Sequence, residues 1–128
     1  MTRKLTLAVA LCVSLFGASA SFAQGVSNVP NRGHAPSRPD GLGRLDLRVF
    51  DSEGRPVRGA SAKLTSKRSG GFLCETWNTT DANGVAVLPP LHVGSLKLVV
   101  KAPGFRAQTI NLAPNALGQP VRVTLARS

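Results

Sequence analysis

The segment that constrains the fold most strongly is residues 80–94, where a polar turn, a short apolar run, a double proline and a second turn follow one another. Asn83-Gly84 is a strong signal for a tight turn because both residue types tolerate a positive φ angle. Residues 85–88 are all apolar, which predicts a short strand covered on both faces. Pro89-Pro90 must end that strand, since neither residue has an N–H to donate to a sheet. The chain is therefore expected to consist of short strands separated by turns.

Alternating side chains predict strands on both sides of this segment. In residues 44–50, Leu45, Leu47 and Val49 alternate with Arg44, Asp46 and Arg48, which is typical of a half-buried strand whose charged residues face solvent. Further strands are expected over residues 58–65, 72–79, 95–100, 108–112 and 121–125. About seven short strands, with turn signals between them and no helical period, predict an all-β protein, a seven-stranded antiparallel β-sandwich.

Residues 72–79 are rich in strand-forming residues, but their alternation allows two arrangements. Either Phe72, Cys74 and Thr76 face the core, or Leu73 and Trp77 do. The choice matters because an exposed aromatic ring is what a sugar-binding surface usually presents. Trp77 and Phe72 are therefore the two candidate ligand contacts in this sequence.

The first 23 residues have the pattern of a secretory signal peptide. Arg3 and Lys4 precede an apolar run of about a dozen residues, which is shorter than the roughly 20 residues of a membrane-spanning helix. Cleavage is expected between Ala23 and Gln24, with cleavage after Ala20 as the alternative. Residues 24–42, rich in Pro and Gly, are expected to be a flexible arm, and residues 43–128 the domain. The protein is thus expected to be secreted or periplasmic, with no membrane span after cleavage.

Charge and cysteine content narrow the function further. Of the 16 basic residues, 14 remain after Arg3 and Lys4 are removed, against 6 acidic ones, which gives a net charge of +8. This charge suits an anionic partner, but it is scattered along the sequence, and the few aromatic residues argue against a specific nucleic-acid reader. Cys74 alone remains after loss of Cys12, so no internal disulfide is expected, and a small buried side chain is the simplest role for it.

Catalytic and metal-binding patterns are weak. His34 lies in the arm and His92 beside a turn, and a zinc site would need more ligands of this kind at a suitable spacing. A hydrolase would need a nucleophile, a base and an orienting group brought together. Asp51 and Glu53 are explained by a turn over residues 51–56. We therefore expect no enzymatic activity, no catalytic residue, no metal and no cofactor.

Four motifs occur in order at residues 50–60 (FDSEGRPVRGA), 80–84 (TDANG), 88–98 (LPPLHVGSLKL) and 102–105 (APGF), and they resemble those of carboxypeptidase regulatory-like domains. Residues 50–60, FDSEGRPVRGA, are similar to the family's opening D-x-x-G-x-P-V-x-G-A, and residues 80–84, TDANG, to its T-D-x-x-G turn. Residues 88–98 and 102–105 resemble L-P-P-G-x-Y-x-L and A-x-G-[FY], although Leu91-His92-Val93 is inserted and Leu96 replaces the usual tyrosine. The resemblance covers residues 43–128. It implies an Ig/prealbumin-like (transthyretin-like) sandwich with a carbohydrate-binding-like fold, which is not itself catalytic.

Two functions follow as expectations. The first is an exported, non-enzymatic interaction or structural module with an unknown protein or glycan partner at the cell envelope or outside the cell. The alternative is a carbohydrate-binding module. Exposure of Trp77 distinguishes them, because stacking on a sugar ring requires a solvent-facing aromatic side chain.

Overall fold

The computed structural model describes residues 29–128, of which Asn31–Ser128 form one compact unit. The expected signal peptide and its cleavage between Ala23 and Gln24 lie outside the described residues. Among the residues that are described, no helix has the length and apolar character needed to cross a membrane.

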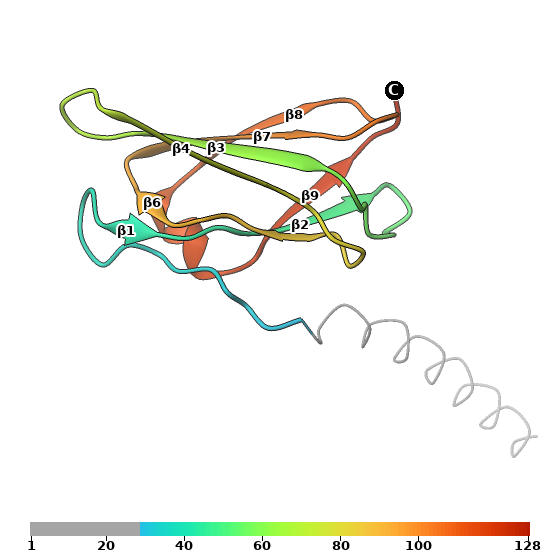
Figure 1. Ribbon diagram of the computed structural model, residues 1–128, viewed down its shortest axis with the longest axis horizontal. Coiled ribbons are helices and arrows are strands. Elements are labelled where there is room, and N and C mark those ends of the chain that lie inside the picture. Colours follow the sequence, from blue (N-terminus) through green and yellow to red (C-terminus); the bar gives the residue numbers. More distant parts are fainter. Residues whose placement is uncertain (1–28) are drawn as a thin grey trace, which may run out of the picture. The chain divides into compact units, whose positions relative to one another are not determined.

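The compact unit is a β-sandwich (Figure 1). One layer is a four-stranded sheet in the order β4-β3-β7-β8, and the other contains a three-stranded sheet, β5-β2-β9, and the short pair β1-β6. The elements are β1 (Leu42–Gly43), β2 (Asp46–Asp51), β3 (Ser61–Lys67), β4 (Leu73–Thr79), β5 (Val85–Val87), β6 (Leu91–His92), β7 (Ser95–Lys101), β8 (Gln108–Leu112), the 3-10 helix η1 (Pro114–Gly118) and β9 (Val121–Leu125).

The predicted all-β sandwich is confirmed, and each of its seven longer strands overlaps one of the seven strands expected from the sequence. One pairing differs from the antiparallel expectation, because β9 lies parallel to β2 with Leu47 opposite Val121. The cause is the connection before β9: η1 carries the chain from β8 in one sheet to β9 in the other, so β9 is not paired through a hairpin.

The core lies between the sheets and combines inward-facing strand residues with residues outside the strands, such as Val57, Leu88 and Leu117. β3 and β7 show the alternation most clearly, with Ala62, Leu64, Leu98 and Val100 almost wholly buried. Cys74 is partly buried and packs against this core. A two-residue period with one buried and one solvent-facing side is what a sheet with one covered face requires.

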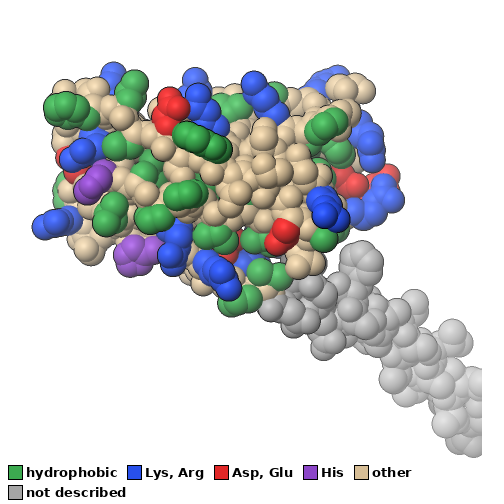
Figure 2. All heavy atoms as spheres, viewed as in Figure 1, with side chains coloured by type: hydrophobic (Ala, Val, Ile, Leu, Met, Phe, Trp, Pro, Cys, Tyr) green, Lys and Arg blue, Asp and Glu red, His purple; other side chains and the backbone are tan. Residues whose placement is uncertain are grey.

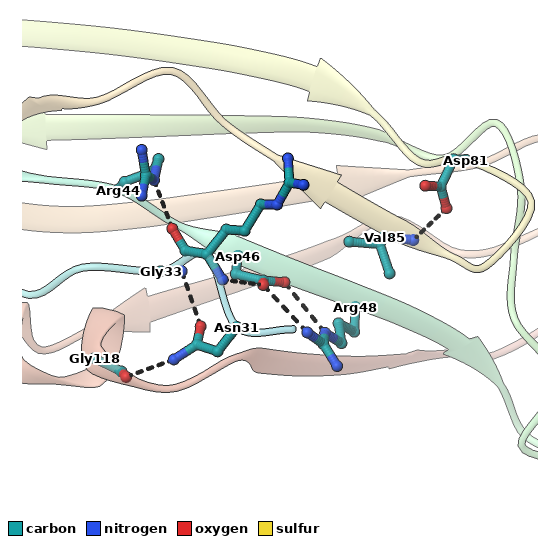
Figure 3. A network of polar contacts seen from close by, with 9 residues as sticks. Asn31, Gly33, Arg44, Asp46, Arg48, Asp81, Val85 and Gly118 are labelled. Atoms are coloured by element: carbon teal, nitrogen blue, oxygen red, sulfur yellow. Dashed lines mark hydrogen bonds and ion pairs between the residues drawn. The ribbon is translucent and has the colours of Figure 1, made fainter. Parts of the chain in front are cut away.

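Strand β2 departs from the prediction of a half-buried strand. Asp46 is fully buried and Arg48 nearly so, although both were expected to face solvent. The Asp46 carboxylate pairs with the Arg48 guanidinium, at 3.2 Å from Arg48 Nε to Asp46 Oδ1, and accepts a hydrogen bond from the backbone N–H of Arg32 at 2.9 Å (Figure 3). The expectation was wrong because a segment before the domain covers the outer face of this strand.

Residues 31–42, expected to belong to a flexible arm, lie against the sandwich. The Asn31 side chain donates a hydrogen bond to the backbone oxygen of Gly118 at 2.9 Å (Figure 3). His34 and Arg44 exchange two backbone hydrogen bonds of 2.9 Å. These residues show no regular spacing of apolar side chains, because polar contacts hold them to the sandwich. The structure therefore adds residues 31–42 to the unit that we expected to begin at residue 43.

The turn over residues 51–56 is organised by the Asp51 carboxylate. Its Oδ1 accepts hydrogen bonds from the backbone N–H groups of Glu53 and Arg55, both at 2.9 Å. The hydrogen bond from Arg55 is the main reason that the pKa of Asp51 lies below its ordinary value, and partial desolvation opposes it.

This lowered pKa predicts acid-dependent stability. Because folded Asp51 binds its proton less readily than unfolded Asp51, its contribution is complete above the unfolded pKa of about 4 and is lost as pH falls towards the folded pKa. We expect Asp51→Asn to show a shallower loss of stability than the unmodified protein below about pH 4. Urea unfolding midpoints measured at several acidic pH values check this, and parallel curves for both proteins would contradict it.

Candidate functional site: the outer face of the four-stranded sheet

The outer face of the β4-β3-β7-β8 sheet presents the chemistry expected of a binding surface. On β4, Thr76 is buried and Cys74 partly buried, whereas Leu73 and Trp77 face solvent. Trp77 is 68% exposed, and Phe72, just before the strand, is 69% exposed. Of the two arrangements that the sequence allowed, the structure places Cys74 and Thr76 inward, but Phe72 does not follow them.

The strand register places Trp77 in a row of solvent-facing residues that crosses the whole sheet. Trp77 lies opposite Lys63 on β3, Lys63 opposite Val99 on β7, and Val99 opposite Thr109 on β8. The next row contains Glu75, Thr65, Lys97 and Asn111. Cross-strand neighbours on one face lie about 5 Å apart, so an aromatic ring, ammonium groups and hydroxyl groups share one surface.

All four lysines of the described residues lie on this face: Lys63, Lys67, Lys97 and Lys101. Figure 2, in the same view as Figure 1, shows basic side chains along the edge formed by the four-stranded sheet. Glu75 is the acidic residue on these strands, and its Oε2 lies 3.5 Å from Lys63 Nζ. Sequence reasoning missed this gathering of charge. The signal was two lysines four residues apart in each of two strands, since i and i+4 share one face.

A groove of about 900 Å³ continues from the Lys67 end of this face. The β3–β4 loop, the turn before β7, the end of β8 and Pro114 line it. Asp40 lies at its rim and accepts hydrogen bonds from the hydroxyl and the backbone N–H of Ser69. The hydroxyl is the main reason that the pKa of Asp40 lies below its ordinary value. Arg68 Nε is buried there with no hydrogen-bond partner in the described part of the chain.

The histidines and the cysteine lie in different places. His92 Nδ1 is 2.9 Å from the backbone oxygen of Asp40, His34 is paired with Arg44 through the backbone, and Cys74 faces the core. Within residues 29–128, no group of three or more His, Cys, Asp or Glu side chains is placed to hold a metal ion.

Among solved structures, the protein is similar to the 3-chlorocatechol 1,2-dioxygenase of Rhodococcus opacus 1CP, with a TM-score of 0.56 and 14% identity. The similarity covers 74% of this chain and 65% of the dioxygenase chain. At this identity it shows a shared sandwich fold and carries no activity across. No curated protein sequence matches the chain. The carboxypeptidase regulatory-like domain family matches residues 44–127, which are most of the chain and contain both faces of the sandwich. The protein belongs to the carboxypeptidase regulatory-like domain family.

Proposed function

We propose that the protein is an exported, non-enzymatic binding module that holds its partner on the outer face of the β4-β3-β7-β8 sheet. The observation that carries this proposal is the exposed Trp77 ring in a row with Lys63. Burying an aromatic ring of this size stabilises a folded domain, so a ring left in solvent on a regular strand favours contact with a partner. Export is supported by residues 1–23, which have the charge and apolar pattern of a secretory signal peptide.

Carbohydrate is the ligand class that this surface favours over a protein partner. Sugar rings stack on aromatic faces, and their hydroxyl groups need short polar partners beside the ring. The next row supplies Thr65 on β3, diagonally from Trp77, and Thr109 and Asn111 on β8 extend the polar surface to the far edge of the sheet. A protein partner would instead be expected to use a continuous apolar patch at the centre of the interface, whereas on β4 the charged Glu75 lies between the exposed Leu73 and Trp77.

A pull-down on insoluble polysaccharides and cell-wall sacculi, at low and high salt, tests this function. We expect Trp77→Ala to weaken binding about five- to tenfold, the amount that one aromatic contact supplies. Leu42→Ala is the matched control, because Leu42 is also an exposed apolar side chain but lies on β1 in the other layer. Equal binding by the two variants, or no binding to any glycan while a protein is retained specifically, would overturn the carbohydrate assignment.

The fluorescence of Trp77 gives an independent prediction, since it is the only tryptophan of the chain. We expect the emission maximum of the free protein to resemble that of tryptophan in water, because the side chain is mostly exposed. A bound glycan that stacks on the ring should shift the emission to shorter wavelength. Binding without any change in emission would place the ligand elsewhere on the molecule.

A further inference from the structure

The four lysines of the sheet face form a regular ladder. Across β3 and β7, Lys67 lies opposite Ser95, Thr65 opposite Lys97, Lys63 opposite Val99 and Ser61 opposite Lys101. Each of these four rows therefore contains one lysine, and the lysine alternates between the two central strands of the sheet.

The dimensions of the ladder follow from strand geometry. Successive rows on one face are two residues apart, which is about 7 Å along the strands, while neighbouring strands lie about 5 Å apart. Four rows place positive charge along about 20 Å of the sheet in a narrow zigzag. A compact anion could meet one or two of these ammonium groups, whereas a linear chain of repeated negative charges could meet all four.

Few acidic groups oppose this ladder. Glu75 lies diagonally from Lys63 on the edge strand β4, with both side chains about half exposed, so solvent screens their ion pair. At the Lys67 end, the Asp40 carboxylate is already bonded to Ser69, and Arg68 adds a further positive charge. The remaining polar side chains of the face, on Ser61, Thr65, Thr79, Ser95, Thr109 and Asn111, are neutral.

We infer that this face binds a linear acidic polysaccharide that runs along the strands, with its carboxylates over the lysine ladder and one sugar ring on Trp77. This inference rests on the proposed binding face and specifies the ligand. Single-stranded nucleic acid has comparable charge spacing, but it is usually held by several aromatic side chains that stack on successive bases. Here Trp77 is the one aromatic side chain in the four lysine rows, whose other positions hold Leu73, Val99, Glu75 and hydroxyl or amide side chains.

Calorimetric titration with oligogalacturonate, a linear polyuronate, tests the ladder. We expect the double variant Lys63→Gln/Lys97→Gln to bind about three- to tenfold more weakly at low salt, from the loss of two exposed charge contacts. The control Arg58→Gln/Arg122→Gln removes the same charge from outside the ladder. Arg58 is exposed before β3, and Arg122 lies on β9 in the other sheet. This double arginine control should change the affinity for oligogalacturonate less than about twofold.

Length and salt give a second measurement on the same protein. Affinity should rise with oligomer length until the chain spans the ladder, and its dependence on salt should be less steep in the double lysine variant than in the arginine control. Equal losses in both double variants would show loose attraction to the net charge and overturn the ladder.

Competing ligands separate this inference from the proposed function. A neutral glucan that binds as tightly as the polyuronate, and loses affinity in Trp77→Ala, would overturn the acidic ligand but leave the binding face. An oligothymidylate that displaces the polyuronate at lower concentration would assign the ladder to nucleic acid. Polyuronate binding that is unchanged in both Trp77→Ala and the lysine variant would overturn the face itself.

Discussion

Gly84→Ala is expected to lower the free energy of unfolding by roughly 3–5 kcal/mol, a large part of the 5–15 kcal/mol typical of a domain. Gly84 has a φ angle of +75°, in the region that costs a side chain about 1–2 kcal/mol. A Cβ atom there would also lie 2.5 Å from the backbone oxygen of Val49 and 3.0 Å from Pro56 Cβ. Since Gly84 O accepts the Val49 N–H at 2.8 Å, relief of the collision would disturb a hydrogen bond to β2.

Gly54→Ala is the matched control. Gly54 has a similar φ angle of +81°, but a Cβ atom there would have no neighbour within 4 Å. We expect Gly54→Ala to lower the free energy of unfolding only by the cost of a positive φ angle for alanine, about 1–2 kcal/mol. Urea unfolding of both variants separates conformational strain from collision. Equal losses of unfolding free energy in Gly84→Ala and Gly54→Ala would mean that the backbone of β2 moves away from the new Cβ atom at little cost. That result would contradict the close packing of this turn.

The strands of this fold were predictable because they obey a local rule. Residues 61–67 and 95–101 alternate on a two-residue period, and the turns at Gly54 and Gly84 have the positive φ angle expected of these glycines. At the Asn83-Gly84 turn, however, only the glycine has a positive φ angle, and the Asp81 carboxylate holds the loop by accepting the N–H groups of Asn83 and Val85. The sequence indicates where the chain turns more reliably than how it turns.

Contacts between segments that are distant in the sequence could not be predicted in this way. Asp46 and Arg48 have the spacing of a solvent-facing pair, but both are buried in the structure, where the backbone N–H of Arg32 donates to Asp46. The candidate site shows the same limit. Lysines that look scattered in the chain become a ladder through the register between β3 and β7, and register depends on hydrogen bonds between segments more than 25 residues apart. The exposure of Trp77 could likewise not be predicted, because the alternation in residues 72–79 allowed either set of side chains to face the core.

Asp46→Ala is the second variant for which a large loss is expected, roughly 3–5 kcal/mol, because the buried Arg48 guanidinium would lose its carboxylate partner. The substitution removes the carboxylate that Arg48 contacts through Nε and through its second terminal nitrogen, both at 3.2 Å. It also removes the acceptor of the Arg32 backbone N–H. We therefore expect the urea unfolding midpoint of Asp46→Ala to fall. We also expect the amides of residues 31–33 to lose protection against hydrogen exchange in the same variant.

Two further variants decide whether burial is the cause of this loss. Glu75→Ala breaks the exposed Lys63–Glu75 pair and should cost at most about 1 kcal/mol. The double variant Asp46→Leu/Arg48→Met replaces both charges by apolar side chains, and it should regain much of the stability lost in Asp46→Ala, since no buried charge then remains. If Asp46→Ala cost no more than Glu75→Ala, water would reach the pair, and residues 31–33 would not seal the outer face of β2 as the structure shows.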